Sequence, residues 1–335
     1  MRYQTERFEK ELRVLNETIW NAAELKFEEF QSMSAMTEFL AAHGFLVEAG
    51  TGGIPTAFHA VYGSGRPVIG LLAEYDALDG LSQKAGIFKQ EPRPETTHGH
   101  GCGHNLLGTG VAAAALDLKE YLEQNPGKGT VIVYGCPAEE GGSGKTIMAG
   151  EGVFDELDAA LTWHPCTINA SMGCSMLANC QAVFRFHGTA SHAGNAPQKG
   201  RSALDAVELM DVGVNFLREH MEMTDRIHYA VLDTGGTSPN VVQDHAAVLY
   251  LVRSRTNAGV RELYERVCDV ARGAALMTDT TVEIEFDKAC SNVVPNEVLG
   301  RLAYETMVRL GPPSYTKEEE TYVKAYHALC GKEAV

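Results

Sequence analysis

The sequence PVIGLLAEYDAL at residues 67–78 is an almost uninterrupted apolar run that ends in acidic side chains. Such a run is typical of a buried parallel strand, because helices cover both faces of a parallel sheet. The segments TVIVYGCPAEEGGSGK at 130–145 and DAALTWHPC at 158–166 repeat the pattern of an apolar strand followed by polar residues. A helical pattern at 105–125 separates the first two strands. This alternation predicts an α/β domain built on a mostly parallel sheet.

The pattern changes at about residue 178. Six segments between there and residue 291 are predicted as strand, helix, strand, strand, helix and strand, which is the ferredoxin-like order of an α+β domain. A chain of 335 residues exceeds the usual size of a single core. We therefore expect an α/β domain formed by 1–177 and 292–335, interrupted by a second domain at 178–291.

Composition excludes several classes of protein. The chain has 28 Lys and Arg against 44 Asp and Glu, a formal net charge of −16, so a basic surface for nucleic acid is not expected. No apolar run reaches the ~18 residues of a membrane span. The charged start MRYQTERFEKEL does not resemble a secretory signal, and the eight cysteines form no CxxC pair. We expect a cytoplasmic protein with reduced thiols and without nucleic-acid or membrane partners.

The segment HGHGCGH at 98–104 places three histidines and one cysteine within seven residues. Imidazole and thiolate are ligands for transition metals, and glycines let the backbone wrap closely round an ion. The alternative is a flexible loop with incidental histidines. The density of the group favours a metal site for zinc or manganese, although the segment leaves open which side chains bind.

Further polar residues follow the predicted strands, at the edge where ligands gather in α/β sheets. Glu139 and Glu140 are adjacent carboxylates, of which one can bind metal while the other moves protons; alternatively, they only begin a helix. His164 is either a ligand or an ordinary core histidine. Asp76 is expected to accept the second ring proton of a ligand histidine, unless it caps a neighbouring helix.

Six motifs in collinear order resemble the aminoacylase and glutamate-carboxypeptidase family of amidohydrolases, which use two metal ions. They are LLAEYDALDGLS, HGHGCGHNLLGTG, CPAEEGGSGK, TWHP, ASHAGNAPQKGRSALDAV and GGTSPNVV. The resemblance covers nearly the whole chain. It implies an α/β catalytic domain, interrupted by a ferredoxin-like domain that serves as lid and dimerisation unit.

The resemblance also implies roles for individual residues. It makes Glu139 the general base and His192 a histidine that reaches the active site of a neighbouring subunit. It implies that Asn240 and Arg253 help to hold the substrate. The metal ligands that it implies are Cys102, His104, Glu140 and His164.

Two departures from the family pattern affect these expectations. Many relatives have a His-x-Asp motif where this chain has Glu74-Tyr75-Asp76, so the cysteine-containing subgroup is the relevant comparison. The last ligand of the family is a histidine in a C-terminal segment that this sequence, ending at Val335, is expected to lack. We therefore expect weak or partial metal loading, little or no amidase activity, and association or poor solubility of this chain.

The expected function is metal-dependent hydrolysis of the amide bond in a small N-acyl amino acid or dipeptide-like substrate, with p-aminobenzoyl-glutamate as one candidate. The protein would act as a homodimer or as a heterodimer with a related subunit. One alternative is a non-catalytic partner subunit or an inactive truncated homologue. A thiol-redox or metal-buffering protein would use only the segment 98–104 and would leave Glu139 and Glu140 without a role.

Overall fold

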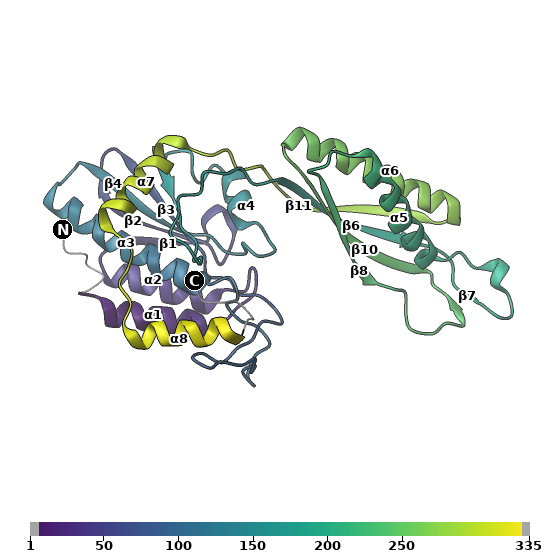
Figure 1. Cartoon of the computed structure of the whole chain (residues 1–335). Helices are drawn as coiled ribbons and strands as arrows, with labels where there is room; N and C mark the ends of the chain where they lie inside the picture. Colours follow the sequence, from purple (N-terminus) through teal and green to yellow (C-terminus); the bar gives the residue numbers. More distant parts are fainter. Residues whose placement is uncertain (1–6, 330–335) are drawn as a thin grey trace. The chain divides into compact units, whose positions relative to one another are not determined.

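The computed structural model describes residues 7–329, in which the chain divides into two compact units (Figure 1). The first unit contains the described residues up to Asn169 together with those from Met307 onward. The second unit contains Ala170–Thr306. The start of the charged N-terminal stretch and Cys330 lie outside the described residues.

The first unit contains a five-stranded sheet in the order β1-β2-β4-β3-β5. β3 pairs in parallel with both β4 and β5, whereas β2 is antiparallel to β1 and to β4. All of these strands except β2 therefore run in the same direction, and the predicted α/β fold with a mostly parallel sheet is confirmed. The strands are β1 (Leu46–Ala49), β2 (Phe58–Ser64), β3 (Val68–Ala73), β4 (Gly129–Gly135) and β5 (Ala159–Leu161).

Apolar side chains cover both faces of this sheet. Val131 and Val133 of β4 pack with α1 (Glu9–Ala22), α2 (Phe30–Ala42) and α3 (His104–Gln124) in one core. The alternate residues Ile132 and Tyr134 pack on the other face with Met148 of α4 (Gly144–Gly150). Because successive strand residues point to opposite faces, a strand buried on both sides must be apolar at every position.

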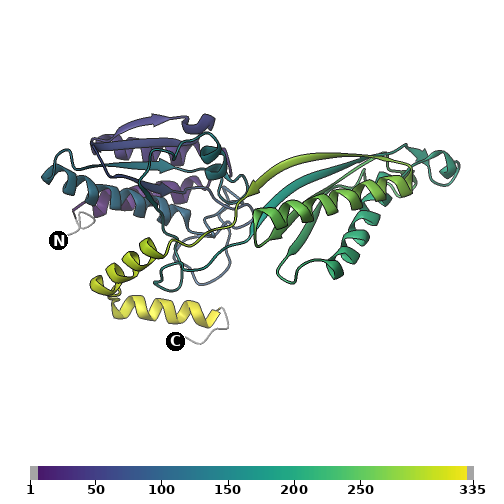
Figure 2. The ribbon, with the colours of Figure 1, turned by 90° about the horizontal axis from the view of Figure 1, so that it is seen from above.

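The second unit contains an antiparallel sheet in the order β11-β6-β10-β8. Alternate residues of β6, including Phe184 and Phe186, pack against α5 (Ala203–Leu217) and α6 (Asn257–Thr278). Figure 2 shows both helices on the same side of the sheet. The strands are β6 (Ala178–His187), β8 (Arg226–Asp233), β10 (His245–Ser254) and β11 (Thr281–Cys290). The predicted ferredoxin-like order of elements is confirmed.

The remaining elements are short strands and C-terminal helices. β7 (Ser191–His192) pairs with β9 (Val241–Val242). α7 (Glu297–Leu310) crosses the boundary between the units, and α8 (Lys317–Leu329) follows it. Over residues 7–329, no helix combines the length and the apolar character that crossing a membrane requires.

Two strands are shorter than the apolar runs predicted. The run at 67–78 gives a strand only as far as Ala73, and the run at 158–166 gives one only as far as Leu161. β4, the neighbour of β3, ends at Gly135, which pairs with Ala73. Beyond this level the backbone after β3 bonds to loops instead: Ala77 N donates to Glu24 O, and Leu78 forms an isolated bridge with Gly99. The sheet therefore ends where the polar residues begin.

Candidate metal centre

The predicted edge of the sheet brings together polar residues from three strand ends and one loop. Glu74 and Asp76 follow β3, the turn containing Glu139 and Glu140 follows β4, and His164 follows β5. The segment 98–104 leads directly into α3. Because β3, β4 and β5 are parallel, their carboxyl ends lie at the same edge.

His104 lies at the centre of this group and is fully buried. Its Nδ1 lies 2.8 Å from Asp76 Oδ1, which leaves Nε2 directed to the other side of the ring. Burial alone would lower the pKa of His104, but the hydrogen bond to Asp76 and the charges of Glu74 and Glu140 raise it overall. With Nδ1 donating to the carboxylate, neutral His104 presents the Nε2 lone pair as a ligand.

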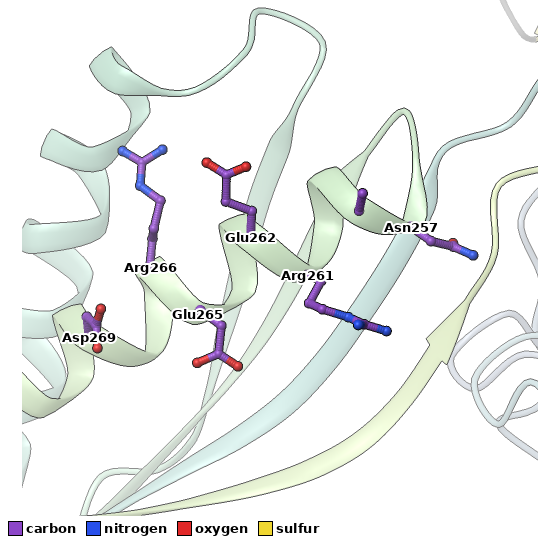
Figure 3. Close-up of a pocket in the computed structure, with 7 residues that line it drawn as sticks. Asn257, Arg261, Glu262, Glu265, Arg266 and Asp269 are labelled. Atoms are coloured by element: carbon purple, nitrogen blue, oxygen red, sulfur yellow. The ribbon is translucent and has the colours of Figure 1, made fainter.

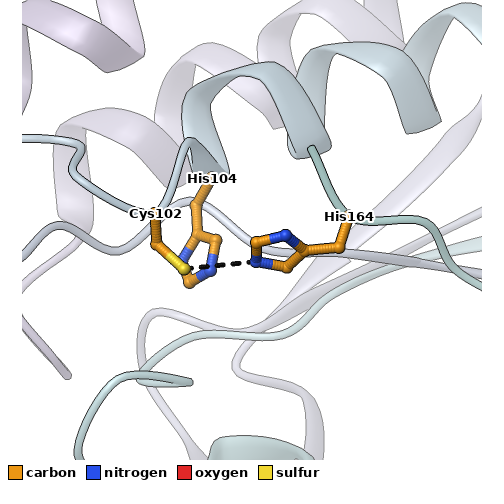
Figure 4. Close-up of side chains that lie close together, drawn as sticks. All are labelled: Cys102, His104 and His164. Atoms are coloured by element: carbon orange, nitrogen blue, oxygen red, sulfur yellow. Dashed lines mark hydrogen bonds between the residues drawn. The ribbon is translucent and has the colours of Figure 1, made fainter. Parts of the chain in front are cut away.

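Two groups of donor atoms meet at His104. The first contains Cys102, His104 and His164, whose ligand atoms lie within 4.8 Å of one another. Cys102 Sγ lies 3.2 Å from His164 Nε2, and Figure 4 shows the two side chains directed at each other. The second contains Glu74, His104 and Glu139 and satisfies the same distance limit. Glu140 is near both groups, with Oε1 4.0 Å from His104 Nε2.

The donor atoms of this cluster are suited to a cation. Glu74 Oε2, His104 Nε2 and Glu140 Oε1 are buried and form no hydrogen bond within the described part of the chain. Glu74 Oε2 lies 3.1 Å from His104 Nε2, but with the ring proton on Nδ1 both of these atoms are acceptors. Buried polar atoms without partners are costly, and a divalent ion would satisfy all three. The set of imidazole nitrogen, thiol sulfur and carboxylate oxygen fits zinc, and the oxygen and nitrogen atoms also fit manganese.

The charges around Glu139 set the state of its carboxyl group. Surrounding protein atoms and the charge of Glu74 raise the pKa of Glu139, while the ammonium of Lys145 opposes that rise. Lys145 Nζ also forms an ion pair with Glu74 Oε1. A carboxyl group with a raised pKa is suited to exchanging protons near neutral pH.

Sequence reasoning misses two members of this site. It assigns no role to Glu74, although Glu74 follows the same strand as Asp76. It does not find Lys145, which is 71 residues from Glu74 and whose motif shows only a helix start. Conversely, two histidines of the segment 98–104 that the sequence offered as candidate ligands lie outside the cluster. His100 Nε2 donates to Ile19 O at 2.9 Å, and His98 Nε2 lies 3.6 Å from Asp79 Oδ1.

The second unit contains His192, Asn240 and Arg253. The backbone N–H groups of Gly194 and Asn195 both donate to His192 Nδ1 at 3.1 Å. Because Nδ1 accepts, the ring proton of neutral His192 is on Nε2. Ala193 N donates to Asn240 O, so Asn240 lies beside this loop. Arg253 lies near the C-terminal end of β10. In the sheet register it is opposite Asn179 of β6 and Arg226 of β8.

A surface hollow in the second unit contains none of the predicted site residues. It is lined by one face of α6, where Glu262 and Arg266, and likewise Arg261 and Glu265, are four residues apart (Figure 3). Opposite charges at this spacing stabilise a solvated helix surface. We therefore assign the hollow no chemistry.

Residues 70–329 match the Peptidase family M20/M25/M40, and this range includes the whole cluster around His104. The chain belongs to this family. The resemblance to the aminoacylase and glutamate-carboxypeptidase family is thereby confirmed. The M20 match also accounts for the joint occurrence of the six motifs in one order.

Two curated relatives extend this comparison. The M20 chain is 52% identical over 310 residues to the B subunit of p-aminobenzoyl-glutamate hydrolase from Escherichia coli (strain K12), covering 92% of this chain and 64% of the relative. It thus spans less than two thirds of that relative's length. It is also 33% identical over 314 residues to Xaa-Arg dipeptidase of Mus musculus, covering 90% of this chain and 68% of the relative.

Solved structures show the same fold. An aminobenzoyl-glutamate utilization protein from Klebsiella pneumoniae superposes with a TM-score of 0.71 at 20% identity, covering 98% of this M20 chain and 91% of that one. A dinuclear metal-binding peptidase of the M20 family from Bacillus subtilis gives a TM-score of 0.61 at 19% identity, with 92% and 82% covered. These likenesses confirm the combination of an α/β unit with a ferredoxin-like unit.

Proposed function

We propose that the chain is a metal-dependent amidohydrolase that cleaves the amide bond of an N-acyl amino acid, with p-aminobenzoyl-glutamate as the first candidate. The convergence of Cys102, His104 and His164 with the carboxylates of Glu139 and Glu140 carries this proposal. The names of the relatives support the substrate class, since one is part of a p-aminobenzoyl-glutamate hydrolase and another is a dipeptidase.

The residues that would hold metal are Cys102, His104, Glu140 and His164. We propose two divalent ions, zinc or manganese, by analogy with the Bacillus subtilis relative, which is a dinuclear metal-binding peptidase. Asp76 would fix the ring of His104 through Nδ1. When bound, the ions would supply a water nucleophile at neutral pH and positive charge for the carbonyl oxygen.

Glu139 is the proposed general base. Its carboxyl group is beside the donor atoms of Glu74 and His104, and part of its side chain is exposed. In the carboxylate form it would take a proton from the attacking water and then deliver that proton to the leaving amine nitrogen. Proton transfer by a positioned side chain contributes typically about 10²–10⁴-fold in rate.

We propose that residues 178–291 form the lid and dimerisation domain and present His192 to the active site of a second subunit. The two N–H groups at His192 Nδ1 support this role, because they leave Nε2–H as the donor for a substrate carbonyl oxygen. Asn240 and Arg253 are proposed to hold the substrate. The second subunit would be a copy of this chain or a related chain, since the relatives include two different subunits of p-aminobenzoyl-glutamate hydrolase from Escherichia coli.

The proposal also places the protein in the cytoplasm. All seven cysteines within residues 7–329 are free thiols. A reducing compartment keeps such thiols available, and Cys102 must be reduced to serve as a ligand.

Metal analysis combined with an amidase assay tests the function. The purified chain should be loaded with zinc or manganese, and release of p-aminobenzoate from p-aminobenzoyl-glutamate should be measured beside other N-acyl amino acids. Metal-dependent turnover that chelation abolishes is the expected result. Absence of turnover by the chain, with or without bound metal, would instead favour a non-catalytic partner subunit or an inactive homologue.

A further inference from the structure

The turn that carries Glu139 has an unfavourable backbone conformation. Ala138, directly before Glu139, is buried and has a φ of 59°, and Ser143 has a φ of 56°. Residues with a Cβ atom rarely adopt this left-handed region, so such a turn persists only where its surroundings hold it. The contacts of Ala138 therefore determine where the carboxyl group of Glu139 lies.

The contact that holds Ala138 comes from a distant part of the chain. Ala138 N donates to Glu29 Oε1 at 2.8 Å, across 109 residues of sequence. Glu29 is fully buried at the start of α2. Lys26, in the same segment, reaches Gly141 O at 3.3 Å. The residues before α2 thus lie directly behind the turn.

The side chain of Glu29 does not cap the helix that it precedes. It occupies the N-cap position of α2, but its side chain forms no capping hydrogen bond. Glu24 performs that task, because its carboxylate accepts from Gln31 N and Ser32 N at 2.9 Å. The carboxyl group of Glu29 is therefore available for Ala138 N–H.

A second carboxylate holds the other side of the turn. Glu140 N donates to Asp76 Oδ2 at 2.8 Å. Glu139 thus lies between two residues whose backbone N–H groups each donate to a buried carboxyl group. Fixing both neighbours restricts the direction in which the Glu139 side chain leaves the backbone.

We propose that Glu29 is a positioning residue that holds Glu139 in its catalytic place through the Ala138 N–H group. This inference rests on the proposed function, in which Glu139 is the general base. Misplacement of a catalytic group by about 1 Å can cost about 10²-fold in rate. Loss of Glu29 should therefore reduce kcat and leave KM and metal content nearly unchanged.

The test compares Glu29→Ala, Glu29→Gln and the neighbouring exposed control Glu28→Ala in the full, metal-loaded chain. We expect a kcat loss of about 10–10²-fold for Glu29→Ala. Glu29→Gln should retain most of the activity, because an amide oxygen also accepts Ala138 N–H. Glu28→Ala should match the wild type. Equal losses in the Gln and Ala variants, or a parallel loss of metal, would overturn the proposal.

A double variant separates positioning from general damage. In the Glu139→Gln background there is no base to position, so adding Glu29→Ala should cause little further loss of the residual rate. If the fold-losses of Glu29→Ala and Glu139→Gln instead multiply in the double variant, Glu29 does not act through Glu139, and its role is merely structural. If Glu29→Ala alone does not fold, the double variant with Ala138→Gly tests the same contact, since glycine adopts the left-handed conformation without a Cβ penalty. A kcat below that of Ala138→Gly alone, at unchanged metal content, supports the proposal, and a kcat equal to that of Ala138→Gly contradicts it.

Hydrogen exchange gives a measurement that does not depend on turnover. Peptides covering 137–144 should lose protection in Glu29→Ala but not in Glu29→Gln or Glu28→Ala, while peptides from α5 and α6 keep theirs. If the wild type hydrolyses no amide, the proposed function fails while this exchange pattern still decides whether Glu29 holds the turn. Unchanged protection at 137–144 in Glu29→Ala would overturn the inference.

Discussion

Asp76 accepts a hydrogen bond from His104 Nδ1 at 2.8 Å, and both side chains are fully buried. The other oxygen of the same carboxylate accepts from Glu140 N at 2.8 Å. Asp76 thus orients one proposed ligand through its ring and another through its backbone. Neither contact uses His104 Nε2 or the Glu140 carboxylate, so both groups remain available as metal ligands.

Asp76→Asn should weaken metal binding by about 10–100-fold, the loss typical of changes behind a ligand histidine. An asparagine side chain can accept from His104 or from Glu140 N, but its NH₂ group cannot accept the second bond. Competition with a fluorescent zinc chelator measures the affinity. The exposed Asp79→Asn in the same loop is the control, and equal affinity of the two variants would contradict the role of Asp76.

Replacing each of the two adjacent glutamates in turn distinguishes the general base from the metal ligand. Glu139→Gln should keep metal and lose turnover by about 10²–10⁴-fold. Glu140→Gln should lose metal affinity as well, because it removes a proposed ligand. Metal content by mass spectrometry and kcat on p-aminobenzoyl-glutamate are the measurements. Metal loss in Glu139→Gln with full activity in Glu140→Gln would reverse the two assignments.

Lys145→Met should move the acid limb of the pH–rate profile to higher pH. A general base works as the carboxylate, so activity falls as pH drops through the pKa of Glu139. Burial and Glu74 already raise this pKa, and the ammonium of Lys145 opposes the rise. Removing that charge raises the pKa further. The dependence of kcat/KM on pH is compared with that of the exposed control Lys128→Met, and a shift to lower pH would refute the prediction.

Cys102 and Cys166 should differ sharply in reactivity in the metal-free protein. Burial, with the hydrogen bond and charge of Glu140, raises the pKa of Cys102 to about 12. At pH 8 only about one Cys102 in ten thousand would then be a thiolate, the reactive form. Cys166 is exposed, and the backbone N–H groups of Ile168 and Thr167 lower its pKa.

Iodoacetamide labelling followed by peptide mass spectrometry measures both rates. Cys166 should be labelled first, and the rate at Cys102 should rise about tenfold per pH unit between pH 7 and 9. Fast labelling of Cys102 at pH 7 would instead indicate a thiolate paired with protonated His164, whose Nε2 lies 3.2 Å from Cys102 Sγ.

Mixing two inactive variants tests whether His192 acts across a dimer. His192→Ala lacks the proposed donor and Glu139→Gln lacks the base, so each alone should be nearly inactive. After subunit exchange, some mixed dimers would contain one intact site, and turnover should recover to a fraction of the wild-type value. Native mass spectrometry establishes that exchange has occurred. No recovery in exchanged dimers would show that His192 acts within its own chain or not at all.

Local sequence patterns are sufficient to place most of the site. Apolar runs are followed by polar residues at Glu74, Glu139 and Thr162, and parallel strands bring their carboxyl ends to one edge. The sequence alone therefore groups Asp76, Glu139 and His164. The order of strands and helices in 178–291 can likewise be predicted from the sequence, because amphipathic periodicity is a property of consecutive residues.

Only the tertiary structure decided which residues of these segments face one another. The segment 98–104 contains three histidines, yet His104 alone among them joins the cluster, because His100 contacts Ile19 O and His98 lies near Asp79. The pairing of Lys145 with Glu74 and of Glu29 with Ala138 joins residues 71 and 109 positions apart. Periodicity shows which face of an element is apolar, but it contains no information on which distant polar side chain reaches a given atom. That choice depends on how the helices, the turn and the sheet edge pack together in three dimensions.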